Sequence, residues 1–162
     1  MRATAPATAA DLPPRLHLDV SYASRRPWVP GPRLLLTWST AALGRNRASV
    51  VLSVRIVGAA GSRKLNARYR HKDKPTNVLS FAGAGESPDG RYFLGELVIC
   101  APVVAQEAKV QDKTLKAHWA HMTIHGVLHL LGLDHEWPKE AAKMASRETQ
   151  ILDQLGFSDP YR

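Results

Sequence analysis

Residues His118–His135 read HWAHMTIHGVLHLLGLDH and hold five of the seven histidines in the chain. Four of them recur at spacings of three, four and four residues, so on a helix they lie within about 80° of one another. Apolar side chains point in nearly every other direction, and the helix, predicted over residues 115–131, is expected to be buried nearly all round. Because buried imidazoles need hydrogen bonds or a metal ion, this stripe requires partners. The stripe consists of His118, His121, His125 and His129.

The second half of this stretch has the spacing of a metal site. His125 and His129 stand at positions i and i+4, which directs two imidazoles at a common point. Gly132 permits the left-handed conformation that ends a helix, so the chain turns and brings back His135. Three neutral nitrogens with an open fourth position are typical of catalytic zinc, and we predict one zinc per chain. A structural site usually takes a fourth protein ligand, and the single cysteine, Cys100, belongs to another element.

Two alternatives to a catalytic metal site follow from the same residues. The histidines of the stripe are also compatible with ordinary hydrogen-bonded core residues, although the full string favours a metal. The spacing is also that of the zinc-peptidase pattern HExxHxxGxxH, but Gly126 stands where that pattern places its general base, Glu. A glycine beside the metal leaves room for a bulky ligand and carries no charge that repels phosphate. The peptidase interpretation is therefore secondary.

Working outward from this helix, the sequence predicts one α+β domain of four strands with helices packed over them. Period-two alternation predicts strands over 15–22 and 50–56, a short strand follows over 78–81, and a glycine-rich hairpin leads to an antiparallel strand over 92–100. Helical spacing covers 33–43, 62–69, 102–111 and 138–155 as well as the histidine helix. The fold class is therefore α+β with a four-stranded mixed sheet. We expect residues 1–13 to form a flexible tail and 14–162 a single domain.

The positive charge is unevenly distributed. The 162-residue chain carries +8, of which residues 1–50 hold +5, residues 51–100 hold +4 and the remainder −1. Seven cations between Arg55 and Lys74 accompany one acid, Asp73, and a patch of this density attracts the phosphate backbone of a nucleic acid. A solvated basic face remains an equal alternative, whereas a membrane surface lacks the amphipathic apolar face that it needs. We expect no secretory signal, no membrane segment and a reducing, cytoplasmic location.

Three blocks stand out in order along the chain: LNARYRHKDKPTNVLSF (65–81), LGELVIC (94–100) and HWAHMTIHGVLHLLGLDH (118–135). Together they resemble the YbeY-type endoribonucleases. The resemblance implies a zinc-dependent, single-strand-specific endoribonuclease that matures the 3′ end of 16S ribosomal RNA and serves ribosome quality control. It implies that the metal ligands are His125, His129 and His135, and that Arg70 is the functional arginine. The partners implied are ribosomal RNA and the ribosome or small-subunit proteins.

The chain departs from the family pattern at two positions. His71 stands where the family typically has Gly, and Glu96 stands where it typically has Asp. Glu96 keeps the charge of the family's residue and the segment around His71 stays basic, so both departures concern details of the site. The first 48 residues carry no motif of the family.

The resemblance gives the basic segment a role. Arg70 would reach the scissile phosphate, because guanidinium binds phosphate oxygens in a two-pronged manner that Lys does not copy. The general base has no assigned residue, and His121 and Asp134 are candidates for proton transfer or ligand orientation. The cations expected to hold the RNA backbone are Arg63, Lys64, Arg68, Lys72 and Lys74.

Further polar and aromatic residues have two interpretations each. Thr76, Asn77 and Ser80 either donate to RNA or simply begin a strand. Tyr69 and Tyr92 are possible platforms for unstacked bases, but Tyr69 is expected to pack inward from the apolar side of its helix. A ribosome-associated RNA-binding factor with a structural metal is the remaining alternative to a nuclease.

Overall fold

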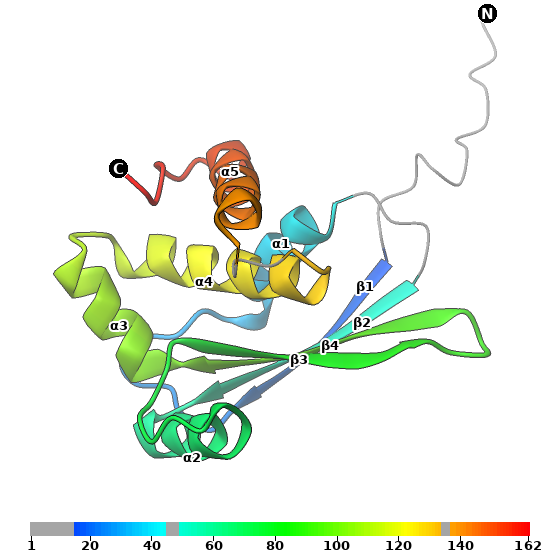
Figure 1. The fold of residues 1–162 in the computed structure, drawn as a ribbon, viewed down its shortest axis with the longest axis horizontal. Helices are drawn as coiled ribbons and strands as arrows, with labels where there is room; N and C mark the ends of the chain where they lie inside the picture. The colour runs from blue at the N-terminus through cyan, green and yellow to red at the C-terminus, as the bar shows by residue number, and fades with distance from the viewer. Residues whose placement is uncertain (1–14, 45–48, 134–136) are drawn as a thin grey trace, which may run out of the picture.

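The computed structural model describes residues 15–44, 49–133 and 137–162. In chain order the elements are β1 (Arg15–Tyr22), α1 (Pro32–Leu43), β2 (Ser49–Val57), α2 (Ala59–Arg70), β3 (Val78–Glu86), β4 (Arg91–Cys100), α3 (Ala101–Val110), α4 (Leu115–Leu130) and α5 (Pro138–Gln154) (Figure 1). This order of strands and helices is the predicted one. The expected tail, residues 1–13, lies outside the described residues.

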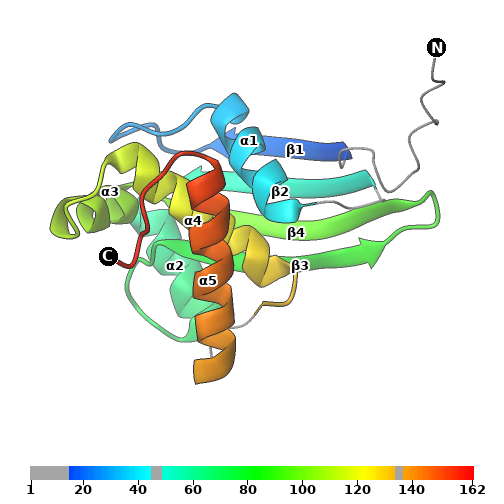
Figure 2. The same ribbon diagram turned by 90° about the horizontal axis from the view of Figure 1, so that it is seen from above.

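The four described strands form one mixed sheet in the order β1-β2-β4-β3. β2 pairs in parallel with both β1 and β4, whereas β3 pairs antiparallel with β4 and forms an edge of the sheet (Figure 2). The α+β fold with a four-stranded mixed sheet is therefore confirmed. Successive side chains of β3 point to opposite faces of the sheet, so neighbouring residues of this edge strand belong to different faces.

The helices cover the two faces of the sheet unequally. α1 and α4 pack on one face with α5 across α4, while α2 lies on the other face (Figure 1). The main core lies under α4 and includes the buried Trp38, Leu52, Leu97 and Trp119. A smaller cluster under α2 contains Val57, Leu79, Val98 and Cys100. The histidine helix is thus held between the sheet and α5, which explains why it is apolar in nearly every direction.

Strand β3 is longer than the sequence indicates. It runs to Glu86 rather than Phe81, and two of the glycines assigned to the hairpin, Gly83 and Gly85, belong to the strand. The register with β4 shifts between Ala82 and Gly85, where the two backbones approach closely. A Cβ on Gly83 would lie 2.3 Å from the Phe93 carbonyl oxygen. The glycines therefore permit close backbone packing at an irregularity of the sheet and do not interrupt the strand.

The described part of the chain contains no helix that is both long and apolar enough to cross a lipid bilayer.

Candidate active site

Helix α4 positions the histidine stripe. Thr114 caps its first turn by accepting a hydrogen bond from the Ala117 amide at 3.1 Å. Along the helix His118 and His121 are buried, while the His125 side chain keeps 26% of its surface exposed. The expected buried histidine helix is therefore present, and its histidines divide into an inner pair and an outer pair.

The outer pair, His125 and His129, opens into a cavity at the edge of the sheet. The cavity has a volume of about 200 Å³ and is lined by Arg70, Asn77, Val78, Ser80, His125 and His129. Arg70 ends α2, three of the lining residues begin or precede β3, and the histidines come from α4. The structure thus brings the predicted functional arginine and two predicted metal ligands to one place.

A buried carboxylate holds His125 from behind. Glu148 of α5 is fully buried and accepts hydrogen bonds from His125 Nδ1, from His121 Nε2 at 2.8 Å and from the Tyr161 hydroxyl. A hydrogen bond at Nδ1 places the proton of a neutral His125 on that nitrogen, so the ring's lone pair lies on Nε2, the nitrogen that would bind a metal. Glu148 therefore orients the ring toward the cavity.

The pKa of Glu148 reflects these contacts. Burial alone would raise the pKa of this carboxyl, but the hydrogen bonds from His121, His125 and Tyr161 outweigh burial and lower the pKa to about 2. Burial of the Tyr161 hydroxyl and its hydrogen bond to Glu148 raise the pKa of this hydroxyl. Glu148 is therefore an ionised hydrogen-bond acceptor across the neutral pH range.

A second carboxylate, Glu107, contacts another residue of the cavity lining. Glu107 of α3 accepts from His118 Nε2 at 3.0 Å and from Asn77 Nδ2 at 3.2 Å. Asn77 Oδ1 in turn accepts from the Val78 amide at 2.7 Å. The Asn77 amide is therefore fixed at both ends. The inner histidines of the stripe, His118 and His121, thus find their partners in carboxylates.

The other predicted site residues lie in different places. His121 does not line the cavity of Arg70 but contacts Glu148 behind it. Thr76 also lies outside the lining, and its backbone hydrogen-bonds with the Ser62 hydroxyl. His135 and Asp134 lie outside the described residues. Within the described residues no three side chains come together as a metal-ligand group, so the fit to a metal rests on His125 and His129.

The basic segment is exposed but partly paired. Arg63 forms a two-pronged ion pair with Asp73, at 2.7 and 2.9 Å, and Arg55 pairs with Glu96 at 2.8 Å. The Arg68 guanidinium lies over the ring of Tyr69. The residues Lys64, Lys72 and Lys74 are exposed. Arg55, one of the seven cations counted in this segment, therefore has a carboxylate partner from outside the segment, on β4.

Two expectations about individual residues are corrected. Gly126 does not leave room beside a metal: it is buried against the sheet, where a Cβ would lie 2.8 Å from Leu97 Cδ2. The close packing of α4 on the sheet therefore explains this glycine. Tyr69 does not pack inward, because 53% of its surface is exposed and its ring meets Phe81 edge-on with centroids 5.0 Å apart.

Comparison with known proteins agrees with this geometry. The family model for endoribonuclease YbeY matches residues 35–156, which is most of the chain. The chain belongs to the YbeY family. Its fold is also similar to the solution structure of TM1509 from Thermotoga maritima, with a TM-score of 0.52 and 22% identity over 86% of this chain and 92% of that one. Membership in the YbeY family indicates a hydrolase acting on RNA, and the buried histidines of α4 are compatible with a metal site.

Sequence reasoning did not find the carboxylates behind the site. Glu148 lies 23 residues beyond His125 in sequence, on a helix whose pattern predicts an ordinary amphipathic element. The requirement that buried imidazoles have partners was the one indication that such acids exist. It did not identify Glu107, Glu148 or Tyr161, because those contacts depend on how α3, α5 and the C-terminal segment pack on α4.

Proposed function

We propose that this protein is a zinc-dependent endoribonuclease that hydrolyses phosphodiester bonds of single-stranded RNA during maturation of the 3′ end of 16S ribosomal RNA and in ribosome quality control. The observation that carries the proposal is the edge cavity, where Arg70 meets His125 and His129. A guanidinium beside two imidazoles joins a phosphate ligand to two metal ligands. Ribosomal RNA as substrate and small-subunit proteins as partners follow from the family, and imply action in the cytoplasm.

The chain's residues fit a metal ion in the edge cavity, beside the last turns of α4. His125 and His129 would hold zinc together with His135, and Glu148 fixes the first of these rings by its Nδ1. When bound, zinc acts as a Lewis acid on a phosphate oxygen and lowers the pKa of a coordinated water. Cys100 is fully buried in the cluster under α2, which supports a ligand set of histidines.

Arg70, Asn77 and Ser80 would position the substrate. The Arg70 side chain lines the cavity from the last turn of α2 and would bind two oxygens of the scissile phosphate. The Ser80 hydroxyl is held loosely, 3.5 Å from the Gly126 carbonyl, and remains able to turn toward the substrate. The Asn77 side chain is held by hydrogen bonds with Glu107 and Val78, so it would keep one orientation when the substrate binds.

Proton transfer in this site needs a group beyond the described lining, because no carboxylate is among the lining residues that the structure describes. Of the two candidates, His121 is engaged by Glu148 and is suited to orienting His125. Asp134 therefore becomes the stronger candidate for proton acceptor. The cations that would bind the RNA backbone beside the cavity are Arg63, Lys64, Arg68, Lys72 and Lys74.

Metal analysis of the purified protein, paired with cleavage of labelled single-stranded RNA by the wild type and by His129→Ala, tests the proposal. We expect one zinc per chain and loss of cleavage in the variant. His17→Ala is the matched control and should cleave normally, because His17 is exposed on β1, at the opposite edge of the sheet from β3. The proposal fails if the zinc-loaded wild type binds RNA but leaves it intact even when ribosomes are supplied. That result would establish an RNA-binding factor with a structural metal instead.

A zinc peptidase is disfavoured by the packing of α4. The glutamate that such enzymes use as general base would stand at Gly126, where a side chain meets Leu97 and Val78. Position 126 faces the sheet, so no acid introduced there could reach a metal.

A further inference from the structure

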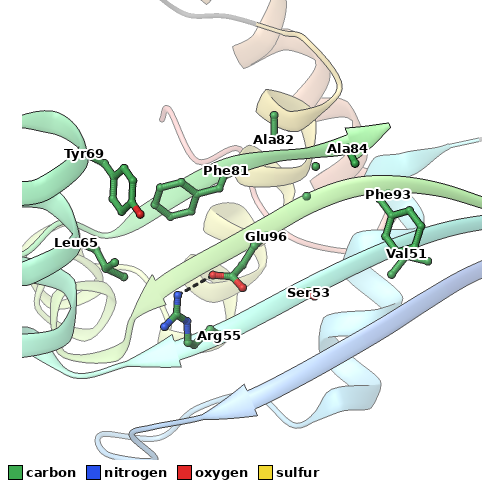
Figure 3. Close-up of a pocket in the computed structure, with 12 residues that line it drawn as sticks. Val51, Ser53, Arg55, Leu65, Tyr69, Phe81, Ala82, Ala84, Phe93 and Glu96 are labelled. Atoms are coloured by element: carbon green, nitrogen blue, oxygen red, sulfur yellow. Dashed lines mark hydrogen bonds and ion pairs between the residues drawn. The ribbon is translucent and has the colours of Figure 1, made fainter. Parts of the chain in front are cut away.

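The face of the sheet opposite α4 carries a second, larger cavity. The single described helix on this face, α2, lies under one end of the strands and leaves the rest of the face open (Figure 1). The resulting groove has a volume of about 470 Å³ and lies between α2 and strands β2, β3 and β4 (Figure 3). None of the residues that line it lines the Arg70 cavity.

Aromatic rings with a guanidinium beside them stand at both ends of this groove. Tyr69 lies at the α2 end and Phe93 at the far end (Figure 3). The Arg68 guanidinium lies 5.3 Å from the centre of the Tyr69 ring, and that of Arg91 lies 5.4 Å from the centre of the Phe93 ring. Arg91 also pairs with Asp89 at 2.8 Å in an exposed ion pair, which a phosphate would have to replace. An aromatic face offers a stacking surface to a nucleobase, and an adjacent guanidinium attracts the phosphate that follows it.

Between the two rings lies a hydrogen-bonded ion pair. Arg55 and Glu96 meet at 2.8 Å, and their side chains keep 43% and 37% of their surface exposed. The pair presents N–H donors and carboxylate oxygens side by side, and a base edge carries both kinds of partner. Because the pair is neutral overall, it does not repel a nucleic acid.

The groove and the Arg70 cavity are joined across the edge strand. Tyr69 and Arg70 are consecutive, and so are Ser80 and Phe81, and in each case one residue lines the groove and the other the cavity. Alternation along β3 places Ser80 and Phe81 on opposite faces. A strand of RNA whose phosphate lies at Arg70 therefore needs to cross no more than β3 to reach the groove.

We propose that this groove binds unpaired nucleotides flanking the cleaved phosphate, with bases stacked on Tyr69 and Phe93 and phosphates at Arg68 and Arg91. The proposal rests on the proposed ribonuclease function and extends its substrate site. It gives a physical reason for a single-strand preference, because stacked bases in a duplex cannot lie against these rings. The basic charge of α2 favours RNA over an uncharged partner as the occupant.

Equilibrium binding of a short fluorescein-labelled single-stranded RNA to the full chain tests the groove, with a chelator present so that nothing is cleaved. Tyr69→Ala should weaken RNA binding roughly 5- to 150-fold, since a base–aromatic stack contributes about 1–3 kcal/mol. Tyr69→Phe keeps the ring and should bind within about twofold of the wild type. Trp28→Ala removes another exposed aromatic, outside the groove, and should leave binding unchanged.

Ser53→Trp provides a second, independent variant. Ser53 lines the groove from β2, so a bulky side chain there would fill the space and should weaken RNA binding while leaving Tyr69 intact. Thermal unfolding of each variant checks that the fold is kept. In addition, photo-crosslinking of RNA containing 4-thiouridine should yield adducts on peptides that hold Tyr69 or Phe93.

The outcomes separate the two proposals. If the wild type binds and cleaves RNA but Tyr69→Ala and Ser53→Trp both bind it equally well, the groove proposal is overturned and the ribonuclease stands. Crosslinks confined to segments outside the groove also overturn the groove proposal. We expect that result if the groove binds a protein segment instead of RNA. If the wild type binds no RNA under any condition, both proposals fail.

Discussion

Arg70 lines the edge cavity, and we expect the proposed cleavage of RNA there to be sensitive to a conservative change of this residue. Arg70→Lys keeps the charge but removes the planar fork that binds two phosphate oxygens together. We expect kcat for RNA cleavage to fall roughly 100-fold, the effect of removing a preorganised donor to a reacting group. Arg33→Lys on α1 is the matched control, since Arg33 is exposed and does not line the cavity. Wild-type kcat in Arg70→Lys would mean that simple positive charge suffices there.

Glu148 contacts His125 and does not line the edge cavity, so we expect it to act through His125 and not on the substrate. In Glu148→Gln one amide oxygen replaces two carboxylate oxygens, so the hydrogen bonds from His125 and His121 compete for it. We expect zinc affinity, measured by competition with a chromophoric chelator, to fall roughly 10- to 100-fold. Glu107→Gln alters a carboxylate that contacts His118 and Asn77 instead, and should keep the wild-type affinity. An equal decrease in both variants would show a general effect on the fold.

His71 has a strained backbone conformation. It caps α2 in the left-handed conformation, with φ 59° and ψ 31°, where a residue with a Cβ is disfavoured. His71→Gly should therefore raise the free energy of unfolding by about 1 kcal/mol, measured by urea denaturation. Gly132→Ala is the reverse test, because Gly132 has φ 96°, and it should destabilise. A lower stability in His71→Gly would show that the His71 side chain makes a contact that outweighs the strain.

At the scale of the element, close packing of α4 on the sheet depends on Gly126. A Cβ there would lie 2.8 Å from Leu97 Cδ2 and 3.4 Å from Val78 Cγ2, and Leu97 is fully buried and cannot swing away. We expect Gly126→Ala to lower the free energy of unfolding by about 1–3 kcal/mol, the usual cost of overpacking a core. Ala117→Gly in the first turn of α4 serves as comparison for helix propensity alone. An unchanged stability in Gly126→Ala would show that α4 can move off the sheet.

The elements were predictable where one face of a helix or strand decides the pattern. Alternation over 15–22 and 50–56 predicted β1 and β2 closely, because in each strand one face is more buried than the other. The prediction of where β3 ends was wrong, because the exposed residues and glycines after Phe81 show no alternation and pairing with β4 decides the structure. The same limit applies to the site: i and i+4 spacing is local to α4 and places His125 beside His129. The packing of α5 that brings Glu148 to His125 is not local and leaves no pattern.

At the scale of the molecule, a dense group of positive charges lies in the segment that borders both cavities. Residues of α2 and the loop after it supply exposed cations, whereas residues 101–162 are slightly acidic. RNA affinity should therefore fall steeply with salt as phosphate contacts release counterions, and each phosphate contact on a single strand adds about 0.7 to the slope of log affinity against log salt. We expect Lys72→Gln and Lys74→Gln each to reduce the slope by about that amount, measured by fluorescence anisotropy over a salt series. Lys109→Gln, exposed on α3, should leave the slope unchanged. If all three variants shift the slope equally, the RNA senses the overall charge of the protein and not a defined track across α2, and the basic residues would then serve attraction alone.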